Sequence, residues 1–280
     1  MTREITKLIH KYLRHDKRFP HVWCPGCGNG IILGALIRAI DRIGLDKDRI
    51  VLASGIGCSG RMPVYVDFNT LHTTHGRALT FATGIKLARP SLTVIAVMGD
   101  GDATAIGGNH FIHAARRNLN LTAIIINNQI YGMTGGQSSP TTPYGSRATT
   151  AAYGHIEHAF SISELAVTAG AAFVARGTVY HAKLLDELME KAILKRGFSV
   201  VEAVSNCHVQ FGRRNEMATP VLMMEWLRDQ AVGVEKAREM TPESLKDRIT
   251  IGILADVEKP VYTEEYNKIR ELARERVAKK

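Results

Sequence analysis

Residues 94–109 read VIAVMGDGDATAIGGN, and this stretch decides the fold. Its first five residues are apolar and rich in β-branched side chains, which predicts a buried strand ending at Met98. Residues 99–102 (GDGD) then form a turn, and a helix begins near Ala103. A turn between a strand and a helix points backbone N–H groups and the positive end of the helix dipole at one place, where a phosphate can bind.

Two common phosphate-binding motifs are excluded by the same residues. The dinucleotide fingerprint needs a third glycine at position 104, which is Thr, and the chain has no Gly-Lys-Ser/Thr sequence for a Walker-type loop. Asp100 in the turn would repel a phosphate unless a cation lay between them. Mg²⁺ takes carboxylate, amide and phosphate oxygens as ligands, so the sequence predicts a divalent cation at Asp100.

A second metal ligand is expected from the next strand along the chain. The run LTAIIIN (residues 121–127) predicts a strand that leads directly into Asn128, 28 residues after Asp100. The intervening helix makes one crossover unit, so the carboxyl ends of the two strands lie side by side, about 4.8 Å apart if they pair directly. Ligands of open α/β sheets bind at this edge. The alternative is that a glycine turn and an Asn-rich turn serve no joint purpose.

The spacing of these residues resembles the diphosphate-binding signature of thiamine diphosphate enzymes, GDG followed after 25–30 residues by NN. The resemblance implies that the acid, the second Asn and a backbone carbonyl two residues later hold Mg²⁺ on the diphosphate. In this chain these are Asp100, Asn128 and the carbonyl of Ile130. It also implies that the rest of the turn, Gly99, Gly101 and Asp102, contacts the cofactor.

The four cysteines form a second constellation. Cys24 and Cys27 lie in WCPGCGNG, Cys58 in SGIGCSGR and Cys207 in SNCHVQ. A CxxC pair with two single cysteines is compatible with zinc or with a [4Fe–4S] cluster, and their spacing favours neither. Four unrelated buried thiols are a third interpretation. The glycines beside the cysteines favour a cluster, because they let backbone N–H groups approach the cluster sulfurs.

Together, WCPGCGNG, SGIGCSGR, HTTHGRA and GDGDATAIGGNH with NNQIYGMTGGQ are similar to the β subunit of 2-oxoacid:ferredoxin oxidoreductases, over about residues 20–215. WCPGCGNG looks most like the 2-oxoglutarate branch. The resemblance implies that all four cysteines bind one [4Fe–4S] cluster. It further implies that Ile56, Gly57 and Cys58 contact thiamine diphosphate, and that His75 of HTTHGRA contacts the cofactor or takes part in catalysis; an ordinary turn histidine is the alternative.

The implied reaction is the oxidative decarboxylation of 2-oxoglutarate to succinyl-CoA and CO₂, with coenzyme A as co-substrate and electrons passed through the cluster to ferredoxin. The family's α subunit supplies the activating Glu and the other half of the cleft, so we expect this chain to be inactive alone; small additional subunits are also compatible. Arg61 is a candidate for the distal carboxylate of the substrate, although it could equally pair with an acid or cap a carbonyl.

The sequence is also compatible with three other functions. The first is the same chemistry on pyruvate or a branched-chain 2-oxoacid. A thiamine diphosphate decarboxylase or transferase half with structural zinc is a second, and a non-catalytic partner subunit whose cysteines only join two segments is a third.

Short apolar runs that alternate with helical stretches predict an α/β fold, here a thiamine diphosphate-binding fold with a mostly parallel sheet and helices on both faces. The loop 135–154 is rich in turn residues and has a length that indicates either a functional or a disordered segment. Residues 218–280 are expected to be helices and turns, so the chain divides into a cofactor and cluster domain (1–207) and a helical C-terminal extension (208–280) packed on the same domain or on the partner. Strands are expected at 50–54, 92–98, 121–127, 172–175 and 199–204, and helices at 29–43, 76–89, 104–117, 161–169 and 181–196.

Composition excludes several classes of protein. With 280 residues and 45% apolar side chains the chain can form a large core, which excludes global disorder. The net charge is +9, but aromatic residues are only 6% and no basic stripe accompanies them, so nucleic acid is not the expected partner. An acidic protein or a phosphorylated cofactor fits this diffuse charge better. No apolar run reaches about 18 residues, so no membrane span and a cytoplasmic location are expected.

Overall fold

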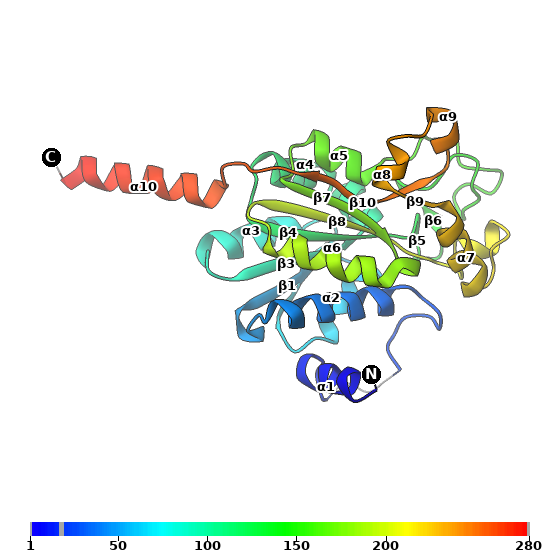
Figure 1. Cartoon of the computed structure of the whole chain (residues 1–280), viewed down its shortest axis with the longest axis horizontal. Coiled ribbons are helices and arrows are strands. Elements are labelled where there is room, and N and C mark those ends of the chain that lie inside the picture. Colours follow the sequence, from blue (N-terminus) through cyan, green and yellow to red (C-terminus); the bar gives the residue numbers. More distant parts are fainter. Residues whose placement is uncertain (1, 17–19, 279–280) are drawn as a thin grey trace.

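The computed structural model describes residues 2–16 and 20–278, and an eight-stranded sheet forms its centre (Figure 1). The strand order is β2-β1-β3-β4-β8-β7-β10-β9. Its pairings are parallel except that of β7 with β10, as expected for a mostly parallel α/β sheet. Its strands are β1 (Ile50–Ser54), β2 (Asn69–His72), β3 (Thr93–Gly99), β4 (Leu121–Asn127), β7 (Phe173–Thr178), β8 (Phe198–Val204), β9 (Ala231–Gly233) and β10 (Ile249–Asp256), with β5 (Ile130–Tyr131) and β6 (Gln137–Ser138) forming a separate hairpin.

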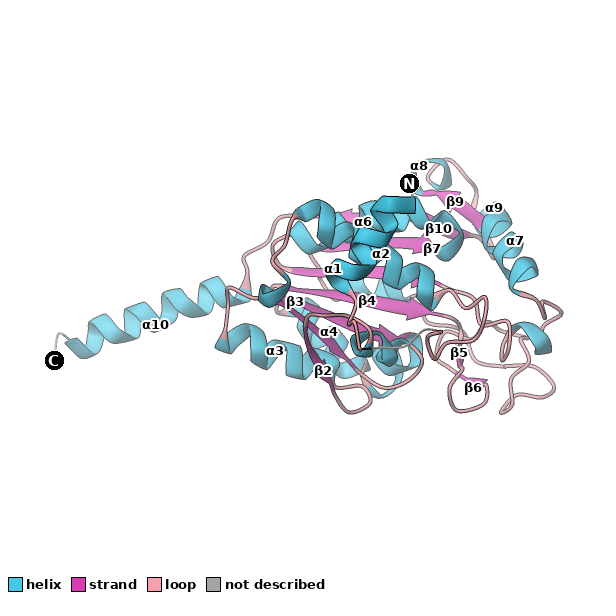
Figure 2. Cartoon of the chain, turned by 90° about the horizontal axis from the view of Figure 1, so that it is seen from below, coloured by secondary structure: helices cyan, strands magenta, loops and turns pink. Residues whose placement is uncertain are grey.

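Helices cover both faces of this sheet, as the apolar strand runs predict (Figure 2). Successive side chains of β4 enter opposite cores: Ile124 and Ile126 pack in the core beneath α2 and α6, whereas Ala123 and Ile125 pack in the core beneath α3, α4 and α5. The α-helices are α1 (Thr2–Tyr12), α2 (Asn29–Ile43), α3 (Ala78–Ala88), α4 (Gly108–Arg116), α5 (Ile162–Thr168), α6 (Ala182–Leu194), α7 (Pro220–Gln230), α8 (Val234–Ala237), α9 (Pro242–Leu245) and α10 (Tyr262–Ala278).

Local capping signals explain several helix ends. Gly44 ends α2 in the left-handed conformation, with φ of 72°, which costs a glycine little. Ser161 caps α5 by accepting a hydrogen bond from the backbone N–H of Glu164. The helix predicted at 104–117 is instead two pieces, a π-helical turn (Asp102–Ile106) followed by α4. Gly107 lies at the junction, where a Cβ atom would collide with the carbonyl oxygen of Asp102.

The C-terminal segment contains the helices that were predicted, but it also contains two strands that were not. β10 pairs antiparallel with β7, and β9 pairs with β10, so this segment extends the sheet. The prediction of helices and turns alone was wrong here because β10 lies near the edge of the sheet, has only Ile251 fully buried, and pairs irregularly with β7 between Ile253 and Ala255. Strand β2 and helix α1 were also missed.

Helix α10 follows β10 and projects away from the body of the molecule (Figure 1). It has 17 residues, and most of its side chains are charged or polar. Across residues 2–16 and 20–278, no helix combines the length and the apolar character that crossing a membrane requires.

Four short 3₁₀ helices complete the connections in the described part of the chain, and one of them borders the site. The 3₁₀ helix η2 (Ser59–Val64) follows Cys58 directly. Because β3 pairs with β4 in parallel, with Gly99 opposite Ile126, the turn after β3 lies beside the turn after β4, as predicted. The other 3₁₀ helices are η1 (Lys47–Arg49), η4 (Val179–His181) and η5 (Gly212–Arg214).

Candidate cofactor and cluster site

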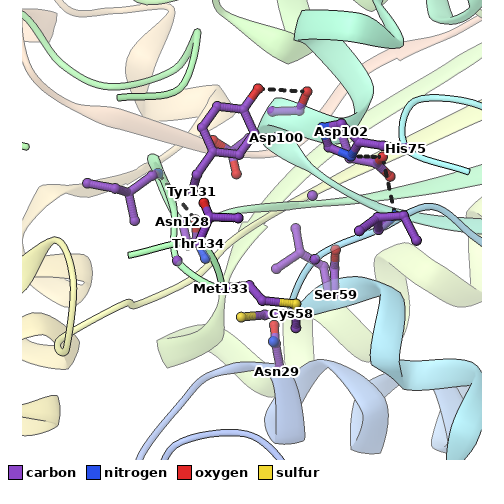
Figure 3. Close-up of a pocket in the computed structure, with 17 residues that line it drawn as sticks. Asn29, Cys58, Ser59, His75, Asp100, Asp102, Asn128, Tyr131, Met133 and Thr134 are labelled. Carbon is purple, nitrogen blue, oxygen red and sulfur yellow. Dashed lines mark hydrogen bonds and ion pairs between the residues drawn. The ribbon is translucent and has the colours of Figure 1, made fainter. Parts of the chain in front are cut away.

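A cavity of about 310 Å³ lies at the carboxyl ends of β1, β3 and β4 (Figure 3). Asp102 and His75 lie at one end of it, and Cys58 and Met133 lie at the other. The structure brings all of the sequence-predicted cofactor residues to this one cavity, although they come from four separate segments. They are Ile56, Gly57, Cys58, His75, Gly99, Asp100, Gly101, Asp102, Asn128 and Ile130.

The carboxylate of Asp100 is buried in the cavity wall, with only 2% of the residue exposed. Its Oδ2 atom accepts hydrogen bonds from the hydroxyls of Ser139, at 2.5 Å, and Thr141, at 2.7 Å. Burial raises the pKa of Asp100, and these two hydroxyls oppose the rise. In the described part of the chain no cationic side chain pairs with it. A buried carboxylate without a cation is costly, so this wall fits a bound metal ion.

The turn after β4 places Asn128 and Ile130 beside Asp100. The side-chain oxygen of Asn127 accepts the N–H of Gln129 at 3.1 Å, and that of Asn128 accepts the N–H of Ile130 at 3.2 Å. Gln129 has a φ of 62°, which non-glycine residues rarely adopt. Two consecutive side-chain-to-backbone hydrogen bonds therefore hold a turn that the backbone alone would not favour.

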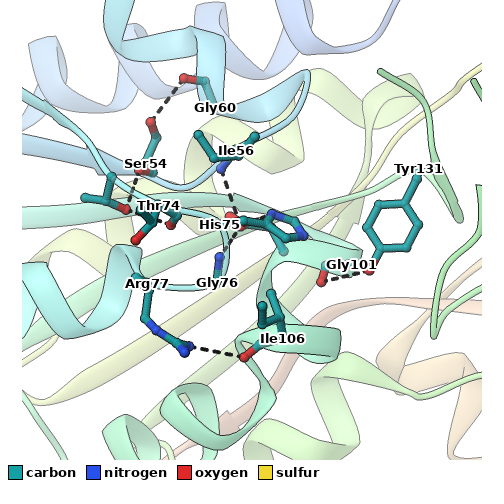
Figure 4. A network of polar contacts seen from close by, with 12 residues as sticks. Ser54, Ile56, Gly60, Thr74, His75, Gly76, Arg77, Gly101, Ile106 and Tyr131 are labelled. Atoms are coloured by element: carbon teal, nitrogen blue, oxygen red, sulfur yellow. Dashed lines mark hydrogen bonds and ion pairs between the residues drawn. The ribbon is translucent and has the colours of Figure 1, made fainter. Parts of the chain in front are cut away.

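Asp102 holds His75 at the rim of the cavity (Figure 3), and Figure 4 shows the polar contacts around His75, Gly76 and Ile56. Asp102 Oδ1 lies 2.8 Å from Nδ1 of His75 and accepts the backbone N–H of Gly76 at 2.6 Å. The backbone N–H of Ile56 lies 3.4 Å from the same oxygen. Burial raises the pKa of Asp102, and Gly76 and His75 oppose the rise. Because Asp102 holds Nδ1, the ring presents its other nitrogen, Nε2, as the atom free to bind a ligand.

All four cysteines line a second cavity, of about 100 Å³, next to the first. Cys58, Asn128, Gly132 and Met133 belong to both walls, so the two cavities adjoin. A Cβ atom on Gly132 would lie 3.4 Å from the sulfur of Cys207 and 3.8 Å from that of Cys58. The glycine therefore lets the backbone pass close to both sulfurs.

Hydrogen bonds join the segments that carry the cysteines. The side-chain amide of Asn206 donates to the carbonyl of Gly26 at 2.9 Å, which links the end of β8 to the turn between Cys24 and Cys27. The indole N–H of Trp23 donates to the carbonyl of Cys58 at 2.7 Å. The sequence motif predicts this meeting of distant segments, and the structure provides it.

The thiols are buried to different degrees. Cys24 is exposed, whereas burial raises the pKa of Cys27 to about 12 and that of Cys58 to about 11. Within the described ranges, no three or more His, Cys, Asp or Glu side chains are arranged to hold a metal ion. The four sulfurs thus surround a cavity without converging on one point.

Arg61 is exposed on η2 and does not line either of the two cavities. It lies close enough to Cys58 for its charge to lower the pKa of that thiol, although burial outweighs this effect. No ion pair or side-chain hydrogen bond of Arg61 is present among the described residues. Arg61 therefore neither pairs with a described acid nor caps a described carbonyl, the two alternatives to substrate binding.

Residues 55–203 match the family model described as thiamine pyrophosphate enzyme, C-terminal TPP binding domain. The 2-oxoglutarate synthase subunit KorB of Methanothermobacter marburgensis is 53% identical over 250 residues, covering 89% of this chain and 87% of that one. That of Methanocaldococcus jannaschii is 49% identical, covering 93% and 96%. The chain belongs to the 2-oxoacid:ferredoxin oxidoreductase β-subunit family.

A solved structure of the same family has the same fold. It is a 2-oxoglutarate:ferredoxin oxidoreductase from Magnetococcus marinus with 2-oxoglutarate, coenzyme A and succinyl-CoA bound. The TM-score is 0.84 at 34% identity, over 95% of this chain and 90% of that one. The family resemblance inferred from WCPGCGNG and the GDG…NN spacing is thereby confirmed.

Some residues of the site were not predicted. Ser139 and Thr141 contact Asp100, and Tyr131 donates a hydrogen bond from its hydroxyl to the carbonyl of Gly101 at 3.3 Å. The only signal was the run SSPTTP inside the long loop 135–154, which is dense in hydroxyl side chains. Asn29 and Thr134 also line the first cavity without having been proposed.

Gly28→Ala is expected to lower the free energy of unfolding by about 1–3 kcal/mol through overpacking. A Cβ atom there would lie 2.8 Å from both Asn206 Oδ1 and Val179 Cγ1, and closer still to Ser205 Oγ. Urea denaturation of the chain measures the change. Gly84→Ala in α3 is the matched control, since no atom of the described residues lies within 4 Å of its Cβ position and alanine favours a helix. Equal stability of both variants would show that the Gly28 contact is not tight.

Proposed function

We propose that this chain is the β subunit of a coenzyme A-dependent 2-oxoglutarate:ferredoxin oxidoreductase that holds thiamine diphosphate, Mg²⁺ and a [4Fe–4S] cluster. The observation that carries the proposal is the shared wall of the two cavities. Cys58, Asn128, Gly132 and Met133 border both the phosphate-binding turn and the space between the cysteines. Such a site can remove electrons from a cofactor-bound substrate with no long transfer step.

The metal site is assigned to Asp100, Asn128 and the backbone carbonyl of Ile130. All three line one cavity, and the buried carboxylate has no other cationic partner within the described residues. Thiamine diphosphate supplies the electron sink that decarboxylation of a 2-oxoacid requires. The chain's own contribution is to orient the diphosphate on residues 99–102 and to neutralise it with Mg²⁺.

His75 is proposed to bind the diphosphate through Nε2. Asp102 Oδ1 holds the opposite ring nitrogen at 2.8 Å, which fixes the orientation of the ring. An Nε2–H group at the rim then donates a directed hydrogen bond to a phosphate oxygen. This gives His75 a binding role rather than a role in proton transfer to the substrate.

The cluster is assigned to Cys24, Cys27, Cys58 and Cys207. The spread of the four sulfurs around a cavity suits a cluster several ångströms across. A zinc ion needs all of its sulfurs about 2.3 Å from one point. The geometry thus favours the cluster over the zinc alternative.

Activation of thiamine diphosphate is assigned to a partner subunit. The acids that line the first cavity are Asp100 and Asp102, and both face the diphosphate end; no described glutamate lines it. The α subunit is therefore proposed to supply the activating Glu and to close the cleft, with ferredoxin accepting the electrons. The decisive assay is reduction of ferredoxin by the αβ complex with 2-oxoglutarate and coenzyme A. Activity of the β chain alone, or none from the complex, contradicts the proposal.

Arg61→Met is expected to lower kcat/KM for 2-oxoglutarate by about tenfold to a hundredfold, equivalent to about 1.5–3 kcal/mol for a lost charge-assisted contact. Arg61 lies beside Cys58, its charge is not paired by any described residue, and it is proposed to bind the distal carboxylate of the substrate. Steady-state assays with pyruvate and 2-oxobutyrate provide the control, because these substrates lack that carboxylate. Equal losses on all three substrates would place substrate choice elsewhere.

A further inference from the structure

A series of buried polar side chains connects the middle of the sheet to the turn that carries Asn128. It begins at Arg176 on β7 and Glu202 on β8, which lie opposite each other in the sheet register. The guanidinium Nε of Arg176 donates to Glu202 Oε2 at 2.8 Å, and the hydroxyl of Ser163 donates to the same oxygen at 2.5 Å. Glu202 is only 3% exposed. Oε2 of Glu202 therefore accepts two hydrogen bonds within the core.

The second oxygen of Glu202 faces the metal-binding turn. Burial alone would raise the pKa of Glu202, but Arg176, Ser163 and Asn127 together outweigh burial and hold that pKa below its usual value. Glu202 is thus a carboxylate, which can only accept hydrogen bonds. Its Oε1 atom accepts from the side-chain N–H₂ of Asn127 at 2.8 Å. Because Oε1 of Glu202 can only accept, the amide of Asn127 must point its N–H₂ group, and not its oxygen, toward Glu202.

The opposite end of that amide shapes the turn. With its N–H₂ group toward Glu202, Asn127 directs Oδ1 toward the N–H of Gln129, at 3.1 Å, and the hydroxyl of Thr141, at 3.0 Å. Gln129 has the left-handed φ of 62°, which this contact helps to maintain. Thr141 also lies 2.7 Å from Asp100. One amide thus contacts both the turn and a hydroxyl on the metal-binding carboxylate.

We propose that Glu202, held by Arg176, is a positioning residue for the Mg²⁺–diphosphate site. It fixes the orientation of the Asn127 amide, and through it the turn that presents Asn128 and the carbonyl of Ile130. This inference rests on the proposed function, since it assigns a role toward the same cofactor. Glu202 touches neither cavity, so its effect reaches the metal only through Asn127.

The direct test is Glu202→Gln in the αβ complex after removal of thiamine diphosphate and metal. The new amide keeps its oxygen toward Arg176 and Ser163, so its N–H₂ group faces Asn127 and forces that amide to turn over. Titration calorimetry with thiamine diphosphate at fixed Mg²⁺ is expected to show a Kd about tenfold higher, or about 1.4 kcal/mol. At saturating cofactor, kcat is expected to recover, because no group that touches substrate has changed.

Two further variants separate positioning from general stability. Ser163→Ala removes a donor from the same carboxylate on the side away from Asn127, so it is expected to lower the thermal midpoint while the cofactor Kd stays within about twofold. Gln129→Gly makes the left-handed turn accessible without help. In that background, Glu202→Gln is expected to raise the Kd by less than about threefold.

The outcomes are distinct. An unchanged Kd in Glu202→Gln, an equal loss in Ser163→Ala, or no rescue by Gln129→Gly overturns the positioning role. If Glu202→Gln yields no folded complex, Asn127→Ala takes its place with the same expected weakening and rescue, and an unchanged Kd again overturns it. If the wild-type complex binds no thiamine diphosphate with Mg²⁺, the proposed function itself is wrong, which is a separate result.

Discussion

Asp100→Ala is expected to abolish Mg²⁺-dependent binding of thiamine diphosphate, weakening it by at least about a hundredfold, or about 2.8 kcal/mol. The carboxylate is the one anionic ligand proposed for the metal, and without it Mg²⁺ has only an amide oxygen and a carbonyl in this wall. The fold should survive, since the buried charge is itself costly without a cation. Calorimetric titration with thiamine diphosphate, with and without Mg²⁺, measures the effect.

Asn128→Ala provides a graded comparison for this result. It removes a neutral ligand from the same cavity, so we expect a weakening in the same direction but smaller than that of Asp100→Ala. Circular dichroism verifies that each variant is folded. Wild-type affinity in Asp100→Ala would show that the diphosphate is held elsewhere, and the assignment of residues 99–102 would then fail.

Cys207→Ser is expected to eliminate the iron–sulfur cluster, although Cys207 lies 149 residues from Cys58 in the sequence. The structure brings the two sulfurs to the same glycine, Gly132, and links the Cys207 segment to the Cys24–Cys27 turn through Asn206. A serine hydroxyl at this place is a much poorer ligand for iron than a thiolate. Iron and sulfide content of the anaerobically purified αβ complex measure the loss.

Ser205→Ala is the matched control for Cys207→Ser. Ser205 is buried two residues away, and its hydroxyl has no hydrogen-bond partner among the described residues. Its loss should therefore leave the iron content unchanged. If Cys207→Ser also retained all of its iron, Cys207 would be merely a buried thiol.

Much of the fold could be predicted because the sequence of each central strand or helix shows both its apolar pattern and the residues that end it. β1, β4 and α2 have the predicted bounds, since each is an apolar run between clear turn residues or a helix ended by Gly44. β10 gives no such signal, because its burial comes from pairing with β7, which precedes it by more than 70 residues. Strands β2 and β9 were missed because they are short and have at most one buried residue each, so neither forms an apolar run in the sequence.

The candidate site likewise contains residues that the sequence predicts and residues that it does not. Asp100 and Asn128 could be predicted from the sequence because they belong to one short motif, GDG followed by NN at a characteristic spacing. Ser139 and Thr141 reach Asp100 from 39 and 41 residues away, on a loop with no regular pattern. In the sequence Glu202 is a single charged residue inside an apolar strand, and only the structure shows that its carboxylate accepts a hydrogen bond from Asn127.

The measurement that tests the central claim most directly is a visible spectrum of the αβ complex, purified anaerobically and loaded with thiamine diphosphate and Mg²⁺. We expect a brown protein with about four irons per β chain. Its broad absorbance should bleach when 2-oxoglutarate and coenzyme A are added without ferredoxin, because electrons from the substrate then stay on the cluster. A colourless protein with one zinc per β chain, or a colour that 2-oxoglutarate leaves unchanged, would contradict the claim.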